Sequence, residues 1–283
     1  METGENSPNL IQANNFNIAL SEQYHLSIQI GLTNCAFSIL DTNDLSYQYF
    51  KSHNFTANSV KESAKKLTAI IGKNELLKAT FSSLSVTYVG FPNTLVPLAV
   101  YDVENNKQIL ELNTDVFEKI GADDIHSQEG KLIYAIPESI ASIIETFFPT
   151  AICNAQETIL IEQYGQLQNF ETQAYINIKS AKVLITIFKG KKLIFSNSFE
   201  FFTKEDLLYY TLFSFEQLKL SAETIPVVLY GDIIKEDENF KLMYDYIRNI
   251  SFGVRSNSFS FPDEFNGLAE HKYFGLFSQV LCA

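Results

Sequence analysis

The sequence contains no tryptophan, two arginines and three cysteines in 283 residues, and its formal net charge is −12. Arginine makes the bidentate contacts by which proteins hold several phosphates, and a polyphosphate backbone requires clustered cations. Nucleic acid is therefore not expected as a partner. The cysteines, Cys35, Cys153 and Cys282, are far apart and odd in number, which favours reduced thiols over a disulfide framework or a zinc site. The four histidines show no HExxH spacing that would hold a metal.

Long apolar segments are also missing. No run of about 18 apolar residues, the length that a membrane-spanning helix needs, occurs in the chain. The opening residues, METGENSPNLIQANNFNIAL, contain no basic segment followed by an apolar one, as a secretory signal would. We therefore expect no membrane partner and a cytoplasmic location. Residues 1–20 also lack hydrophobic periodicity, and they are expected to form a flexible arm.

Apolar and aromatic residues, by contrast, are abundant, and the chain is long enough for two cores of ordinary size. A pattern of three short strands, a helix and a further strand occurs twice. The strands are expected at residues 26–30, 36–40, 45–50 and 84–89 in the first copy, and at 175–178, 183–188, 193–199 and 226–230 in the second. Strands that alternate with helices indicate an α/β fold. The repeat indicates duplication, with domains at residues 21–155 and 156–283.

Capping signals mark the helix of each copy. The first helix is predicted at residues 59–71, because the capping box Ser59-x-x-Glu62 precedes an apolar stripe and Gly72 follows it. The second is predicted to begin after Thr203, whose hydroxyl can accept a backbone hydrogen bond.

Segments outside the repeat carry weaker signals. Residues 98–130 are expected to form an insertion in the first domain, with a short helix at 114–120. Residues 131–136, KLIYAI, are predicted to be the fifth strand of the first domain. Further helices are predicted at residues 137–148, at 155–170 between the domains, at 240–250 and at 271–281.

The repeated order of strands and helix resembles the ribonuclease-H-like unit of the actin-like ATPases: actin, sugar kinases and the large heat-shock chaperones. The chaperone-type first phosphate loop, Ile-Asp-Leu-Gly-Thr-Thr-Asn-Ser, aligns with residues 28–35, where Gln29 replaces the aspartate. The second loop, Asp-Leu-Gly-Gly-Gly-Thr, aligns with residues 177–182, where Asn177 replaces the aspartate and the glycines are lost. The resemblance implies an actin-like fold with a degenerate cleft formed by Gln29, Gly31, Thr33, Asn34, Asn177, Lys179, Ser180, Lys182, Gly231 and Asp232.

The two substitutions bear directly on catalysis. Magnesium requires charged oxygen ligands, and two amides in place of two carboxylates remove about two negative charges from the metal site. Phosphate loops also need glycine for close backbone approach. We therefore expect neither hydrolysis nor a bound cofactor. Lys179 and Lys182 could still attract an anion as point charges; alternatively, residues 179–182 form a solvated hairpin turn.

A more local likeness concerns residues 91–97, FPNTLVP, and the closing His271-x-Tyr273-Phe274. These resemble the bacterial family of domain of unknown function 3822, which lies near the actin-like ATPases and supplies no activity. Residues 94–97 are interpreted as a rigid connector that cannot continue a strand ladder, because Pro92 and Pro97 lack donors. The alternative is a partner-binding loop.

Three functions are compatible with these observations. The first is a catalytically inactive actin-like protein that acts as a binding or scaffold module for another cytoplasmic protein. The second is a diverged ATP-binding ATPase or small-molecule kinase in which Asp41, Asp102 or Asp232 binds the metal. The third, an assembly factor for polymers or envelope machinery, depends on fold analogy alone. The many apolar aromatic residues are also compatible with a homodimer.

Overall fold

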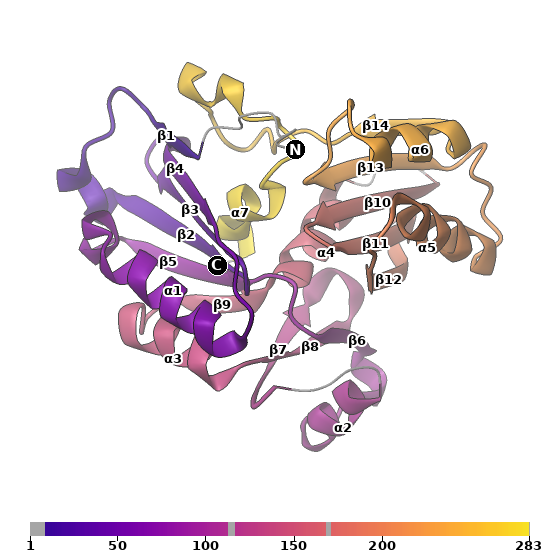
Figure 1. Ribbon diagram of the computed structural model, residues 1–283, viewed down its shortest axis with the longest axis horizontal. Coiled ribbons are helices and arrows are strands. Elements are labelled where there is room, and N and C mark those ends of the chain that lie inside the picture. The colour runs from indigo at the N-terminus through magenta and orange to yellow at the C-terminus, as the bar shows by residue number, and fades with distance from the viewer. Residues whose placement is uncertain (1–8, 113–116, 168–170, 283) are drawn as a thin grey trace.

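A computed structural model describes residues 9–112, 117–167 and 171–282 (Figure 1). The first large sheet has the order β1-β4-β3-β2-β5-β9. Its strands are β1 (Leu10–Gln12), β4 (Ser46–Asn54), β3 (Asn34–Asp41), β2 (Tyr24–Ile30), β5 (Ser83–Tyr88) and β9 (Ile152–Ala155). The second large sheet has the order β12-β11-β10-β13-β14. Its strands are β12 (Lys192–Glu200), β11 (Lys182–Lys189), β10 (Thr172–Lys179), β13 (Pro226–Gly231) and β14 (Asn249–Phe252).

The predicted duplication is confirmed by the pairing of these strands. In each large sheet three consecutive strands pair antiparallel, and the first of the three then pairs parallel with the strand that follows the helix. A further parallel strand, β9 or β14, closes each unit. The fold is therefore α/β with two mixed sheets, as predicted.

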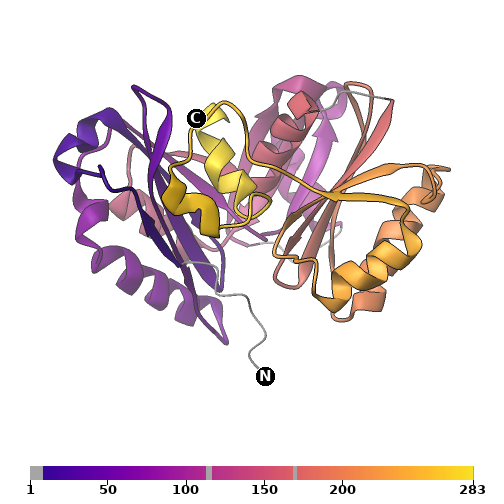
Figure 2. The ribbon, with the colours of Figure 1, turned by 90° about the horizontal axis from the view of Figure 1, so that it is seen from above.

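Helices cover the outer faces of both sheets and fill the space between them (Figures 1 and 2). The helices are α1 (Val60–Gly72), α2 (Asn106–Glu111), α3 (Glu138–Phe147), α4 (Gln156–Leu167), α5 (Lys204–Gln217), α6 (Glu238–Tyr246) and α7 (Phe274–Ser278). Alternate residues of β2, such as Ile28, pack with α1 and α3, because successive side chains of a strand point to opposite faces. The helices α4 and α7 lie between the sheets, whereas α5 and α6 lie outside the second one. None of the helices in the described ranges has both the length and the apolar character needed to span a bilayer.

The helix starts follow the predicted caps with one difference. Ser59 caps α1 by accepting the N–H of Glu62 at 3.2 Å, but the Glu62 carboxylate accepts from Asn58 instead of Ser59, so the box is only half formed. Thr203 and Asp206 form a complete capping box on α5. Gly72 is the last residue of α1, not the residue beyond it as predicted.

A third sheet corrects the prediction for residues 131–136. These residues belong to β8 (Gly130–Ile136), the central strand between β6 (Asn93–Pro97) and β7 (Lys119–Ile125), and the fifth strand of the first unit is β9. The inserted sheet therefore runs from residue 93 to 136, wider than the predicted 98–130. The predicted helix at 114–120 lies partly outside the described residues, and its last two residues begin β7.

The rigid-connector interpretation of residues 94–97 is wrong. These residues form β6, which pairs antiparallel with β8 from Asn93 to Pro97. The ladder tolerates proline here because β6 is an edge strand, and Pro97 is its last residue.

Both ends of the described chain pack on the first sheet. Residues 10–12 form the edge strand β1 on β4, so this part of the expected arm is attached, and residues 1–8 lie outside the described residues. The predicted helix at 271–281 is divided into α7 and a 3-10 turn, and that at 240–250 ends at Tyr246 before β14. Phe265 and Phe277 pack with Tyr47 and Phe50 of β4. The boundary at residue 155 stays a prediction.

Candidate functional site

A pocket of about 260 Å³ lies where the loops of the two units meet. Its wall includes residues 32–34 after β2, residues 179–182 between β10 and β11, and the first residues of α4. Six of the ten predicted site residues line it: Thr33, Asn34, Asn177, Lys179, Ser180 and Lys182. The sequence alignment therefore brings the two loops to one place, and the other four residues lie around it.

Gln29 is buried behind the pocket and does not line it. Its side chain is 2% exposed, and its Nε2 lies 3.2 Å from the position that a Cβ on Gly275 of α7 would take. The Nε2 of Gln156 lies at the same distance from that position. Among the described residues the Nε2 of Gln29 has no hydrogen-bond partner. Helix α7 thus covers the position where the resemblance would place a metal-holding carboxylate.

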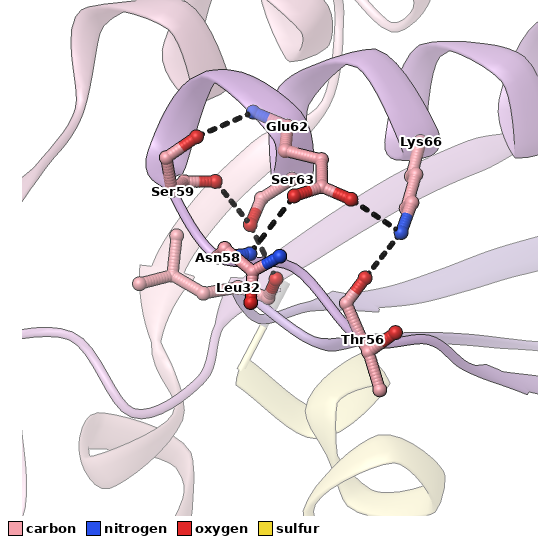
Figure 3. Close-up of polar contacts among 7 residues, drawn as sticks. All are labelled: Leu32, Thr56, Asn58, Ser59, Glu62, Ser63 and Lys66. Carbon is pink, nitrogen blue, oxygen red and sulfur yellow. Dashed lines mark hydrogen bonds and ion pairs between the residues drawn. The ribbon is translucent and has the colours of Figure 1, made fainter.

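The first loop is fixed by its own asparagine and by α1. The N–H of Gly31 donates to the carbonyl of Asn34 at 2.9 Å, and the Asn34 side chain lies 3.0 Å from where a Cβ on Gly31 would be. The Ser63 hydroxyl of α1 donates to the Leu32 carbonyl at 2.6 Å (Figure 3). The Asn34 amide therefore occupies the space beside Gly31 that close approach of an anion would need.

A small polar network lies at the start of α1, next to the bond between Ser63 and Leu32 (Figure 3). Glu62 accepts the N–H of Asn58 at 2.9 Å and forms an ion pair with Lys66 at 2.7 Å. Lys66 also donates to the carbonyl of Thr56. Lys66, the basic residue of this network, is therefore already paired with Glu62 and Thr56.

The second loop is a two-residue hairpin turn, so that interpretation of its backbone is confirmed. Lys179 pairs with Lys182 across it, and Ser180 has φ 54°. The Lys179 side chain forms an ion pair with Asp232 at 3.2 Å and lies over the Tyr273 ring at 4.8 Å. Lys182 donates to the Gly90 carbonyl at 2.8 Å and forms an ion pair with Glu200 at 3.5 Å. Both lysines thus have partners already.

Gly231 and Asp232 lie beyond the second loop and support it. Gly231 has φ +89°, and its N–H donates to the His271 carbonyl at 3.0 Å. The N–H of Asp232 donates to the Ile178 carbonyl at 2.6 Å, next to the loop. These two residues join the ends of β13 and β10.

Of the acids considered as relocated metal ligands, two lie at turns. The Asp41 carboxylate accepts the N–H of Asn43, and that of Asp102 accepts the N–H of Glu104. Neither lines the pocket. Within the described ranges, no three side chains of His, Cys, Asp or Glu are grouped to hold a metal ion. The three cysteines are free thiols, as predicted.

Magnesium nucleotide, which the fold family implies, does not fit these residues. Asn177 is neutral, Gln29 lies under α7, and the second turn contains no glycine. The two lysines that would balance phosphate charge are each held by a carboxylate. A hard cation and its phosphates need charged oxygens and open backbone N–H groups.

Glu157 is a site residue that the sequence analysis did not single out. It lies in the first turn of α4, lines the pocket and is 7% exposed. Burial raises the pKa of its carboxyl to about 7, against the opposing effects of Lys182 and the Asn93 side chain. No sequence pattern around residue 157 marks it, because its burial depends on how α4 packs in the folded chain, and a buried glutamate is uncommon.

We expect Glu157→Gln to stabilise the protein at high pH only. Because the folded-state pKa is above the ordinary 4.5, the favourable contribution of the protonated carboxyl is complete below pH 4.5 and is lost as the pH rises through 7. At pH 8 the variant should gain at most about 3.5 kcal/mol, at about 1.4 kcal/mol per unit of pKa. At pH 4.5 the two proteins should be equally stable.

Urea unfolding at both pH values measures this difference. The matched control is Glu223→Gln, which makes the same replacement at an exposed position outside the pocket. Equal stability of Glu157→Gln and the parent at pH 8 would contradict a raised pKa.

Comparison with known proteins identifies both the fold and the family. The chain is similar to a protein of actin-like ATPase fold and unknown function from Bacteroides thetaiotaomicron, with TM-score 0.76 and 20% identity over 89% of this chain and 97% of that one. It is also similar to a chain of the PilM-PilN type IV pilus biogenesis complex, with TM-score 0.63 and 12% identity over 91% of this chain and 98% of that one. At these identities the likeness establishes the fold alone, and the predicted actin-like ATPase fold is confirmed.

A weaker match is to the chromosomal replication initiator protein DnaA of Lachnoclostridium phytofermentans, 23% identical over 176 residues. The chain spans only 38% of the length of that protein, and 60% of this chain is matched. The family model described as protein of unknown function, DUF3822, matches residues 13–250. With most of its length matched, the chain belongs to the DUF3822 family.

Proposed function

We propose that this protein is a binding or scaffold module for another cytoplasmic protein, which keeps the actin-like fold and does not turn over nucleotide. The observation that carries the proposal is that neither loop offers a metal-holding acid at the expected position or an unpaired lysine. Asn177 and the buried Gln29 occupy the positions of the metal-holding acids, and Lys179 and Lys182 are paired with Asp232 and Glu200. An anion that binds either lysine would have to displace the carboxylate paired with that lysine.

The type of partner follows from charge and from fold analogy. A net charge of −12 with two arginines argues against nucleic acid. PilM, which shares the fold, occurs in a complex with PilN. That likeness supports a protein partner for this chain by analogy only.

Thermal unfolding with and without 5 mM magnesium ATP tests the proposal. We expect no change in Tm, because a ligand stabilises only by RT ln(1 + [L]/Kd), and Lys179 and Lys182 of the pocket are each paired with a carboxylate. Magnesium ATP at about 100 times its Kd would add about 2.7 kcal/mol, which shifts the Tm of a chain of this size by several degrees. Magnesium alone and AMP serve as controls.

A diverged ATP-binding enzyme is the second candidate, and Glu157 is the observation that favours it. A pocket carboxyl with a pKa of about 7 is suited to general acid or base work near neutral pH. A rise in Tm with magnesium ATP, accompanied by release of phosphate that Glu157→Gln abolishes, would establish this candidate and reject the first.

A further inference from the structure

Helix α5 is apolar on both of its sides. Its inner side packs on the second sheet through Leu207, Thr211 and Phe215, which are at most 1% exposed. Its outer side carries Tyr209 and Phe213, which are 59% and 41% exposed and whose rings stack with centroids 5.7 Å apart. Exposed aromatic rings that lie together on the outer side of such a helix form an apolar patch of the kind found at interaction sites. The outer side therefore points to a binding surface.

Helix α6 completes a groove beside these rings. The groove has a volume of about 310 Å³ and lies between the two helices, which pack against each other outside the second sheet (Figure 1). Leu208, Leu212 and Leu242 line it together with the rings of Tyr209, Phe213 and Tyr246. An ion pair between Lys204 and Glu238 at 2.9 Å joins the N-terminal ends of the helices. This region is the α5/α6 groove.

The charges of the α5/α6 groove are all of one sign. Its two charged lining residues are Glu205 and Glu216, which stand eleven positions apart on α5. At 1.5 Å per residue they are about 16 Å apart along the helix, or about three turns. A second copy of this acidic chain would bring these glutamates against like charge, and an anionic lipid surface would do the same. The complementary occupant is a short apolar surface with a cation at each end.

We propose that the α5/α6 groove binds an amphipathic helix of a partner protein, with apolar residues at positions i, i+3, i+4 and i+7 and with Lys or Arg about three turns apart. Such a helix places its apolar stripe on Leu208, Leu212 and Leu242 between the aromatic walls, and its cations meet Glu205 and Glu216. The proposal deepens the proposed function by naming a partner chemistry. The groove lies on the opposite face of the second sheet from the pocket, since Val183 and Ile185 pack under α5 and Leu184 lines the pocket.

Fluorescence anisotropy on the full chain tests the proposal with a designed probe. The probe is a labelled 18-residue helical peptide with leucines at the stated spacing and two lysines at each end; its matched control has glutamates at the ends. We expect the lysine peptide to bind at least fivefold more tightly. Phe213→Ala should weaken it at least tenfold, as loss of a buried aromatic anchor does. Tyr244→Ala, which removes an exposed ring of α6 outside the groove, should leave binding unchanged.

Charge reversal in the α5/α6 groove tests whether Glu205 and Glu216 select the charge of the bound peptide. Glu205→Lys/Glu216→Lys should reverse the preference, so that the glutamate peptide binds more tightly. The proposal is overturned if neither peptide binds, if Phe213→Ala has no effect, or if binding ignores the charge reversal. It is equally overturned if sedimentation shows a dimer that Phe213→Ala dissociates, or if phosphatidylserine vesicles bind in place of the peptide. None of these results depends on magnesium ATP, so failure here is distinguishable from failure of the proposed function.

Discussion

Gly231→Ala is expected to destabilise the protein by about 4 kcal/mol or more, a loss that single substitutions seldom produce. Gly231 has φ +89°, a region that costs an alanine about 1–2 kcal/mol by itself. In addition, a Cβ on Gly231 would lie 2.0 Å from the carbonyl oxygen of Ile178 and 3.0 Å from Oδ1 of Asn177. The first contact is with backbone inside the paired strands β10 and β13, so it cannot be relieved by a side-chain rotation.

Gly190→Ala is the matched control for this prediction. Gly190 also has positive φ, at +56°, but a Cβ there would meet nothing within 4 Å. Its loss should therefore be only the backbone cost of about 1–2 kcal/mol. Urea unfolding of the two variants separates the clash from the conformational cost. Equal losses of unfolding free energy in the two variants would contradict the prediction. They would mean that β10 and β13 can move apart at no cost, although the two strands are hydrogen-bonded in parallel.

The sequence predicts the repeat because its signals are local. Turn residues such as Thr33 and Asn34 separate apolar runs of strand length, and caps such as Thr203 mark helix starts. The same signals assign residues 131–136 to the wrong sheet, because the sequence of a short apolar strand does not show which sheet the strand joins. Its partners are residues 93–97 and 119–125, and that choice depends on contacts far apart in the sequence. The inserted sheet is therefore visible only in the structure.

The candidate site was predictable only in part, because the surroundings of its residues also depend on contacts far apart in the sequence. The alignment treats Gln29 and Asn177 as equivalent residues of two phosphate loops, and in the strand order they are equivalent. Their surroundings differ because the C-terminal helix α7 packs against Gln29, whereas Asn177 lines the pocket. The pKa of Glu157 likewise follows from burial between the units, which no pattern around residue 157 predicts.

The pocket and the α5/α6 groove lie on opposite faces of the second sheet, so they can be tested separately. The lysines that line the pocket are engaged within the chain, Lys182 with Gly90 and Lys179 with Asp232. The groove instead presents aromatic rings with exposed area. Exposed apolar patches with a polar rim are typical of interaction surfaces. The binding role is therefore expected at the groove.

Tyr164→Ala is expected to lower the free energy of unfolding by about 4 kcal/mol, the usual cost of removing a fully buried aromatic ring. Tyr164 of α4 is fully buried between the two units, and its ring stacks on Tyr175 of β10 at 4.5 Å and on Phe274 of α7 at 5.7 Å. Tyr164→Phe keeps the ring and removes a hydroxyl that has no hydrogen-bond partner among the described residues. Because an unpaired buried hydroxyl costs about 1–3 kcal/mol, this variant should be as stable as the parent or more so. Urea unfolding measures the free energy of unfolding of both variants. If Tyr164→Phe lost as much stability as Tyr164→Ala, the hydroxyl and not the stacked ring would be the group that joins the two units.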